Sequence, residues 1–222
     1  MTQNKTINIG PHSAQFADLN VKGEQMKIDG ESFYKISNVN GMRPFFMSIV
    51  SHSNHWMFIS STGALSAGRK DSDAALFPYY TDDKISDSFE TTGSKSIFLV
   101  EKNGQTFLWE PFSLRQASLY KISRNLYKNA FGNKVIFEEI NHDLEIRFTY
   151  EWNSTDRYGF VRKSSLYNTA NSAVKVQFID GIQNVLPYGI EEALQNSTSN
   201  LVDAYKRTEL VEGSSLAVFA LS

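Results

Sequence analysis

Apolar residues at every second position recur along this 222-residue chain. The clearest such run consists of Leu144, Ile146, Phe148, Tyr150 and Trp152. Successive side chains of a β-strand point to opposite faces, so this spacing places one set in a core and the other toward solvent. The 16 Phe, 10 Tyr and 3 Trp add to the pattern, because aromatic side chains suit a pleated, half-buried surface. The chain is therefore predicted to be all-β.

Polar turn residues between the apolar runs predict antiparallel hairpins. Residues 45–50 and 55–59 flank a polar turn of four residues. Residues 94–101 and 105–110 flank Lys102-Asn103-Gly104. The Asn-Gly pair is a strong hairpin signal because both residues tolerate positive φ angles.

Further strands and one helical segment complete the expected fold. The strands are 160–167, 173–179, 216–221 and a pair within 134–153 that is joined by a turn at 141–143. Residues 189–205 have helical spacing that the polar run 196–200 interrupts, so short helical turns are expected there. About ten or more strands at regular spacing predict a large antiparallel β-sandwich with minor helical turns.

The expected organisation is one domain after a short lead-in. Residues 1–24 are polar and punctuated by Gly, and residues 25–222 form the predicted single β-sandwich domain. The sequence stops at Ser222 directly after an apolar run. We therefore expect the N-terminal part of a longer protein.

Composition excludes several classes of function. The formal net charge is −2 and Lys and Arg are scattered, so no basic face for nucleic acid is expected. Cysteine is absent, which excludes disulfides, thiolate nucleophiles and Cys-ligated metals. No apolar stretch approaches the ~18 residues of a membrane span, and residues 1–10 lack the apolar centre of a secretion signal. A cytoplasmic location away from membranes is expected, and an origin from a cleaved precursor remains open.

No complete set of catalytic or metal-binding residues is apparent. His52 and His55 fall in a predicted turn with no third His or Cys nearby, and Asp71 and Asp73 could complete a metal site only if the chain folds back, so we predict no metal and no cofactor. Glu138 and Glu139 precede a turn and are interpreted as the solvated edge of a sheet. Glu110 stands between a Trp and a Pro; it is either a partly buried acid–base group, since burial raises carboxyl pKa values, or a hydrogen-bonded structural carboxylate.

The segment 61–83 combines aromatic and charged residues. Aromatic rings cover the C–H faces of a sugar while charged side chains hold its hydroxyls. In the alternative interpretation the rings are core and the charges belong to a loop tip. The candidate saccharide-binding residues are Arg69, Asp71, Asp73, Tyr79, Tyr80, Asp82, Trp109 and Glu110.

The same segment resembles a signature in the N-terminal domain of cellobiose phosphorylase-like enzymes. In that signature a strand ending in a Ser-Gly turn leads to a polar stretch, then to an aromatic and an Asp. Residues 104–112 and 160–170 resemble later segments in the same order, so the resemblance covers about two thirds of the chain. Arg69, Asp71, Asp73 and Asp82 match its polar part, whereas Tyr79 and Tyr80 stand where the family has Trp.

The resemblance implies a galactose mutarotase-like β-supersandwich. It further implies that the chain is a non-catalytic N-terminal domain of a glycoside hydrolase- or phosphorylase-like protein. In such proteins a following (α/α)6 barrel carries the catalytic carboxylate, and the sandwich packs on it and contributes to dimerisation. The implied partners are carbohydrate, this C-terminal helical domain and a second copy of the chain in a homodimer.

Two other functions remain open from the sequence. A stand-alone carbohydrate-binding module would use Trp109, Trp152 or the Tyr79-Tyr80 pair as a platform for the sugar. A mutarotase-like sugar epimerase would need a His and Glu acid–base set, and no such set is evident in the sequence.

Overall fold

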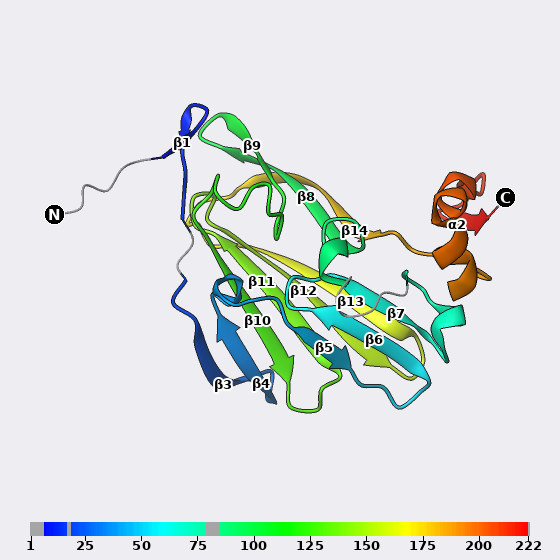
Figure 1. The fold of residues 1–222 in the computed structure, drawn as a ribbon. Helices are drawn as coiled ribbons and strands as arrows, with labels where there is room; N and C mark the ends of the chain where they lie inside the picture. Colours follow the sequence, from blue (N-terminus) through cyan, green and yellow to red (C-terminus); the bar gives the residue numbers. More distant parts are fainter. Residues whose placement is uncertain (1–6, 17–18, 79–84, 222) are drawn as a thin grey trace.

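The computed structural model describes residues 7–16, 19–78 and 85–221, which form two layers of antiparallel strands (Figure 1). One layer is a six-stranded sheet of order β13-β12-β11-β10-β4-β3. The other consists of two three-stranded sheets, β14-β8-β9 and β5-β6-β7. Buried side chains from all three sheets form one hydrophobic cluster between the layers. The predicted all-β antiparallel sandwich is confirmed.

The described elements have the following bounds. The six-stranded sheet contains β3 (Lys22–Ile28), β4 (Glu31–Ser37), β10 (Ile122–Asn129), β11 (Lys134–Asn141), β12 (Ile146–Thr155) and β13 (Gly159–Asn168). The second layer contains β5 (Phe46–Ile49), β6 (His55–Ser60), β7 (Leu65–Arg69), β8 (Gly93–Lys102), β9 (Gln105–Trp109) and β14 (Lys175–Gln183). Peripheral hairpins are β1 (Asn8–Ile9) with β2 (His12–Ser13), and β15 (Lys206–Leu210) with β16 (Ala217–Leu221). The helical segments are η1 (Val39–Gly41), η2 (Ser72–Ala74), η3 (Ser86–Ser88) and α2 (Glu192–Tyr205).

Strand β12 shows why the alternating pattern produces this core. Ile146, Phe148, Tyr150 and Trp152 are each at most 3% exposed and belong to the central cluster. The intervening side chains lie on the opposite face of the six-stranded sheet. β12 is paired on both sides, with β11 and with β13, so its backbone hydrogen bonds are made on both edges.

The predicted hairpins form where the turn residues place them. Asn103 and Gly104 both adopt positive φ angles, 53° and 73°, and join β8 to β9. Residues 51–54 join β5 to β6 in antiparallel register. The turn residues and the alternating pattern therefore agree at these two hairpins, which confirms both predictions.

Two features of the six-stranded sheet differ from the sequence interpretation. β10 lies between β4 and β11 but was not predicted, because it contains Arg124 and Asn125 where a buried strand is expected to be apolar. The interpretation of Glu138 and Glu139 as a solvated edge is wrong, since they are 6% and 1% exposed. Buried polar groups of this kind require hydrogen-bond partners.

The helix α2 lies at one end of the sandwich, beside the C-terminal hairpin (Figure 1). A non-helical residue, Thr198, divides it into two short pieces, which confirms the expected short helical turns. Leu186, Ile190 and Val202 form a small second core there, with Ala75 packed against it. Within the described residues, no helix combines the length and apolar character needed to span a membrane.

Candidate functional site

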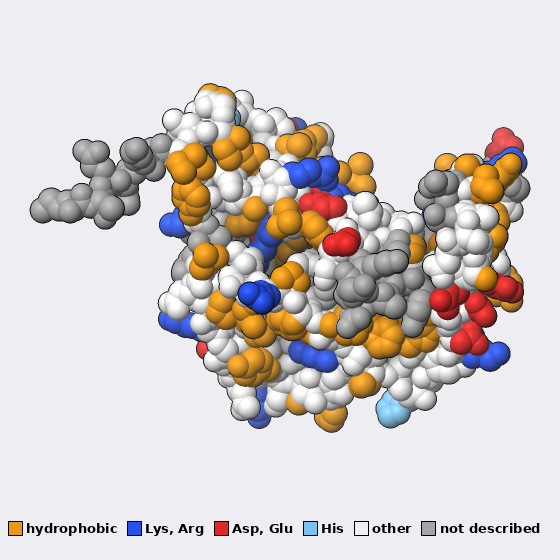
Figure 2. Space-filling view, in the orientation of Figure 1, with side chains coloured by type: hydrophobic (Ala, Val, Ile, Leu, Met, Phe, Trp, Pro, Cys, Tyr) orange, Lys and Arg blue, Asp and Glu red, His pale blue; other side chains and the backbone are white. Residues whose placement is uncertain are grey.

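A cleft of about 750 Å³ lies between the end of β7 and the segment that leads to α2. Its walls are the β7 end with the following turn (68–71 and 73–76), the β12–β13 turn (158–160), His55 and residues from the 186–191 segment. We call this feature the cleft. Three of the candidate saccharide-binding residues, Arg69, Asp71 and Asp73, line it together. Figure 2 shows acidic and basic side chains gathered at the right-hand edge of the molecule, below α2.

The antiparallel register of β6 and β7 sets the basic side of the cleft. Arg69 is the last residue of β7 and lies opposite His55, the first residue of β6. Its Nε donates to Asn54 Oδ1 at 3.2 Å, which holds the guanidinium beside the turn. Lys70 follows with a φ of 73° and its amide donates to the Asn54 carbonyl at 2.6 Å. These contacts fix the direction of the chain as it leaves the strand.

Gly68 allows the indole ring of Trp56 to pack against the turn. A Cβ atom at position 68 would lie 2.6 Å from Trp56 Cζ2 and 2.7 Å from Ala75 Cα, so only glycine fits without displacement. The Trp56 Nε1 donates to the Asp71 carbonyl at 3.2 Å. Trp56 is half-buried, whereas Trp109 and Trp152 are 1% and 3% exposed. Trp56 is thus the tryptophan that can report on the cleft.

Asp73 connects this turn to α2. Its Oδ1 accepts a hydrogen bond from the Glu192 amide at 3.1 Å, at the first residue of the helix. A carboxylate at this position accepts a hydrogen bond from one of the free amides of the first turn, and its negative charge interacts favourably with the positive end of the helix dipole. Asp73 therefore shapes the cleft and can contact a ligand only with its remaining oxygen capacity.

Two tyrosines that the sequence analysis missed also line the cleft. Tyr158, in the turn between β12 and β13, is 70% exposed, and Tyr188 is fully exposed. The guanidinium of Arg157 lies 5.2 Å from the Tyr158 ring centroid. Gly159 has a φ of 68° and stands against the His55 ring, so that the turn stays close to β6. Tyr158 and Tyr188 are far in sequence from segment 61–83, so nothing in the sequence indicated that they line the same cleft.

The side chains of the cleft carry charges of both signs. The cleft holds two basic side chains, Arg69 and Lys70, and three acidic ones, Asp71, Asp73 and Glu191. Such a nearly balanced set suits a neutral ligand with many hydroxyl groups, which can both donate and accept hydrogen bonds. Exposed tyrosine rings add faces that cover apolar C–H groups.

The other sequence-predicted site residues lie elsewhere. Tyr79, Tyr80 and Asp82 fall outside the described residues. Trp109 is 1% exposed in the central core, so its ring offers no surface platform to a sugar, and the same burial applies to Trp152.

Glu110 lies in a cluster of ion pairs beside β8. Its carboxylate pairs with Lys95 and, at 3.1 Å, with Arg115 Nη2. Glu90 joins the same two cations at 3.1 and 3.4 Å and accepts from the Leu114 amide at 3.0 Å. Burial alone would raise the pKa of Glu90, but the Leu114 amide and Lys95 lower that pKa below its ordinary value. The cluster anchors the loop after β9, which fits the structural alternative for Glu110.

The buried Glu139 is the centre of a second network. Its Oε1 accepts from Trp109 Nε1 at 2.9 Å, and its Oε2 accepts from the Phe112 amide and Arg124 Nε, both at 2.7 Å. Arg124 Nη2 also donates to the Ser113 carbonyl at 2.9 Å. This network explains how polar residues occupy the interior positions of β10 and β11.

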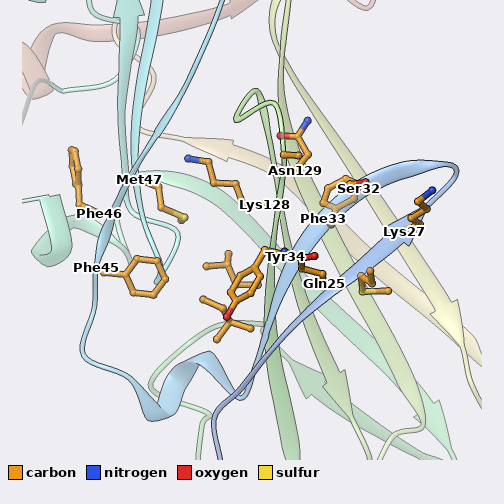
Figure 3. Close-up of a pocket in the computed structure, with 14 residues that line it drawn as sticks. Gln25, Lys27, Ser32, Phe33, Tyr34, Phe45, Phe46, Met47, Lys128 and Asn129 are labelled. Atoms are coloured by element: carbon orange, nitrogen blue, oxygen red, sulfur yellow. The ribbon is translucent and has the colours of Figure 1, made fainter.

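A larger cavity of about 890 Å³ lies between the β3–β4 hairpin and β5 (Figure 3). The rings of Tyr34 and Phe45 point into it in Figure 3, whereas Phe46 points away. Lys128 Nζ donates to the Ser48 carbonyl at 2.8 Å, and partial burial lowers the pKa of this lysine. The charged residues in this lining are Lys27 and Lys128, whereas the cleft has five charged side chains of both signs, so the cleft is the better site for a hydroxyl-rich ligand.

Metal chemistry gains no support from the geometry. Across residues 7–16, 19–78 and 85–221, no three His, Asp or Glu side chains are grouped closely enough to hold an ion. His55 instead forms a hydrogen bond with Ser53 and an edge contact with Phe160 at 5.4 Å between ring centroids.

Comparison of the chain with known protein families and with curated proteins finds no match.

Proposed function

We propose that this chain is a non-catalytic sandwich domain of a carbohydrate-processing protein and that its cleft contacts the saccharide. The observation that carries the proposal is the convergence of Arg69, Asp71 and two exposed tyrosines in one cleft of near-balanced charge. Charged side chains hold sugar hydroxyls in pairs, and tyrosine rings cover the apolar ring faces. The resemblance of segment 61–83 to carbohydrate-active proteins points to the same ligand class.

The carboxylates best placed for acid–base chemistry are occupied by cations. Glu110 pairs with Lys95 and Arg115, and Glu139 pairs with Arg124. Both carboxylates are therefore engaged in contacts within the chain. The proposal assigns the catalytic carboxylate to a separate helical domain of the (α/α)6 type, as the resemblance of segment 61–83 implies.

Tryptophan fluorescence tests saccharide binding at the cleft. Titration with glucose, galactose and cellobiose should change the emission of the half-buried Trp56, whose Nε1 contacts the cleft turn. Tyr158→Ala should weaken binding about tenfold, since a stacked aromatic ring contributes roughly 1 to 1.5 kcal/mol.

Tyr34→Ala is the matched control, because Tyr34 is half exposed and lines the other cavity. It should leave the saccharide affinity unchanged. Absence of any saturable emission change with all three sugars would contradict binding. Sub-millimolar affinity of the isolated chain would favour a stand-alone binding module over a supporting domain.

The non-catalytic part of the proposal is tested by polarimetry. The chain should leave the rate of glucose and galactose mutarotation at its uncatalysed value. A rate that rises in proportion to protein concentration would overturn this part and favour the epimerase.

A further inference from the structure

A smaller cavity of about 220 Å³ lies apart from the cleft, against the inner face of β10 and β11. It is bounded by η1, by the β6–β7 turn and by the loop after β9, and Arg124 forms part of its wall. We call it the Arg124 pocket. Its volume is below the ~300–1,000 Å³ of pockets for drug-sized ligands, so it suits a molecule with one ring.

Arg124 has hydrogen-bonding capacity that the protein leaves unused. The side chain is 10% exposed and its Nε and Nη2 donate to Glu139 and to the Ser113 carbonyl. Nη1 makes no hydrogen bond to any residue that the structure describes. This atom is accessible to solvent, since the buried atoms that lack a partner do not include it. A guanidinium carries two N–H donors on Nη1. Since Arg124 is one of the residues that line the pocket, these donors can serve a molecule bound there.

The charge of Arg124 is already balanced. Glu139 holds it at 2.7 Å, and the Glu139 carboxylate is itself saturated by Trp109 and the Phe112 amide. An anionic ligand would add an uncompensated negative charge to a nearly buried site, which is costly. A neutral ligand that offers an oxygen acceptor fits this electrostatic setting.

Three aromatic side chains line part of the pocket, together with aliphatic and polar residues. Phe89, Phe112 and Phe137 all border it, and the rings of Phe112 and Phe137 meet edge to face with centroids 6.4 Å apart. Phe112 has a φ of 65°, a conformation that bulky residues seldom adopt. The bond from its amide to Glu139 helps to hold it there. The ring is thus fixed at the pocket wall.

We propose that the Arg124 pocket binds one neutral six-membered polyol ring, the size of a single monosaccharide unit. Its C–H face lies against the phenylalanine rings, and one of its oxygens accepts hydrogen bonds from Arg124 Nη1. The choice of a sugar-like ring rests on the proposed function, whereas the neutral charge and the size follow from the pocket. The site is separate from the cleft.

Methionine methyl NMR tests this site independently of Trp56. Met42 borders the Arg124 pocket, and Met26 borders the large cavity near β3. Titration of [¹³C-methyl]methionine-labelled protein with glucose or galactose should shift the Met42 signal saturably and leave the Met26 signal unchanged. An anionic sugar, glucose 6-phosphate, should bind at least about tenfold more weakly than glucose.

Two variants separate ligand contact from folding. Arg124→Lys keeps the charge beside Glu139 but removes Nη1, and should weaken the Met42 response about tenfold. Asn40→Phe places a ring at the exposed rim of the pocket and should abolish the response while the circular dichroism spectrum stays that of the wild type. If the lysine variant does not fold, the phenylalanine variant decides alone.

The outcomes distinguish this inference from the proposed function. Quenching of Trp56 without a Met42 shift would overturn the Arg124 pocket and keep the cleft. A Met42 shift without a Trp56 response would support the pocket and remove the cleft. A Met42 shift that persists unchanged in Asn40→Phe would overturn the assignment to this pocket.

Discussion

Glu139 and Arg124 form the most buried of the ion pairs among the described residues, with side chains 2% and 10% exposed. Each partner has additional hydrogen bonds, from Trp109 and the Phe112 amide to Glu139 and from Arg124 to the Ser113 carbonyl. Ions buried in this way are tolerated only when their charge and hydrogen-bonding groups are satisfied. The pair therefore ties the loop after β9 to the sheet through polar contacts.

Replacement of Glu139 should be among the most destabilising conservative changes in the chain. Glu139→Gln leaves Arg124 charged and buried without its counter-ion, and should reduce the free energy of unfolding by about 3–5 kcal/mol. Urea denaturation followed by circular dichroism measures this. Glu145→Gln is the control, because Glu145 pairs with Lys102 at the surface and should cost about 0–1 kcal/mol. Equal costs for the two variants would contradict the role of Glu139.

Asp180 links the edges of the two layers through its hydrogen bonds. Because its pKa is shifted, we expect the stability of the fold to depend on pH. Burial alone would raise the pKa of this carboxyl, but hydrogen bonds from Arg162, Ser164 and Ser96 lower its pKa to about 2, from an ordinary value of 3.8. Since the folded-state pKa is depressed, ionised Asp180 stabilises the fold above about pH 4. That stabilisation is lost as the pH falls from about 4 to about 2.

Urea midpoints measured from pH 2 to pH 7 test the contribution of Asp180. Asp180→Asn should be less stable than the wild type at neutral pH, and the difference should shrink between about pH 4 and pH 2. A difference that stays constant across this range would show that the Arg162 contact does not depend on ionised Asp180.

At the scale of elements, the hairpins were predictable and β10 was not. Asn103-Gly104 and the alternating residues of β12 carry local signals that survive without knowledge of the fold. β10 has Arg124 and Asn125 at positions 8% and 7% exposed, which become favourable only through Glu139 and Glu138 on the neighbouring strand. Such tertiary compensation leaves no periodic signal in the sequence of β10.

The cleft was predictable only from one of its walls. Arg69, Asp71 and Asp73 stand close together in sequence, so their composition indicated a binding surface. Tyr158 and Tyr188 reach the same cleft because the β12–β13 turn packs near His55 and the chain after β14 returns to Leu76, whose carbonyl accepts from the Leu186 amide at 2.8 Å. Contacts between distant segments supply the aromatic wall.

Substitution of Gly68 should disturb the turn that borders the cleft. Gly68→Ala adds a methyl group 2.6 Å from Trp56 and should cost about 1–3 kcal/mol of stability, because the ring and the turn must move apart. Thermal unfolding and the Trp56 emission maximum both measure the effect. Gly181→Ala in β14 is the matched control, since its added Cβ meets nothing within 4 Å. Identical behaviour of the two variants would contradict the packing account.

At the scale of the whole molecule, the cleft forms where the sandwich meets α2. The helix is attached by the small cluster of Leu186, Ile190 and Val202 and by the bond from the Glu192 amide to Asp73. Few contacts of this kind hold the helix, so its attachment is expected to open more readily than the central sheet.

Loss of the Asp73 carboxylate should loosen α2 specifically. Asp73→Ala removes the partner of the Glu192 amide and should cost about 0.5–2 kcal/mol, measured as faster amide hydrogen exchange across α2. Asp71→Ala is the control, since its carbonyl rather than its side chain contacts Trp56. Unchanged exchange in the Asp73 variant, or equal acceleration in both, would show that the carboxylate does not anchor the helix.

Amide NMR mapping shows directly whether the proposed cleft holds a saccharide. Titration of ¹⁵N-labelled protein with cellobiose should give saturable shifts at Arg69, Lys70, Tyr158 and Tyr188, which line the cleft. The amide of Tyr34, in the other cavity, should stay in place. If none of the four cleft amides shifts saturably, whether or not amides elsewhere shift, the cleft does not hold the saccharide.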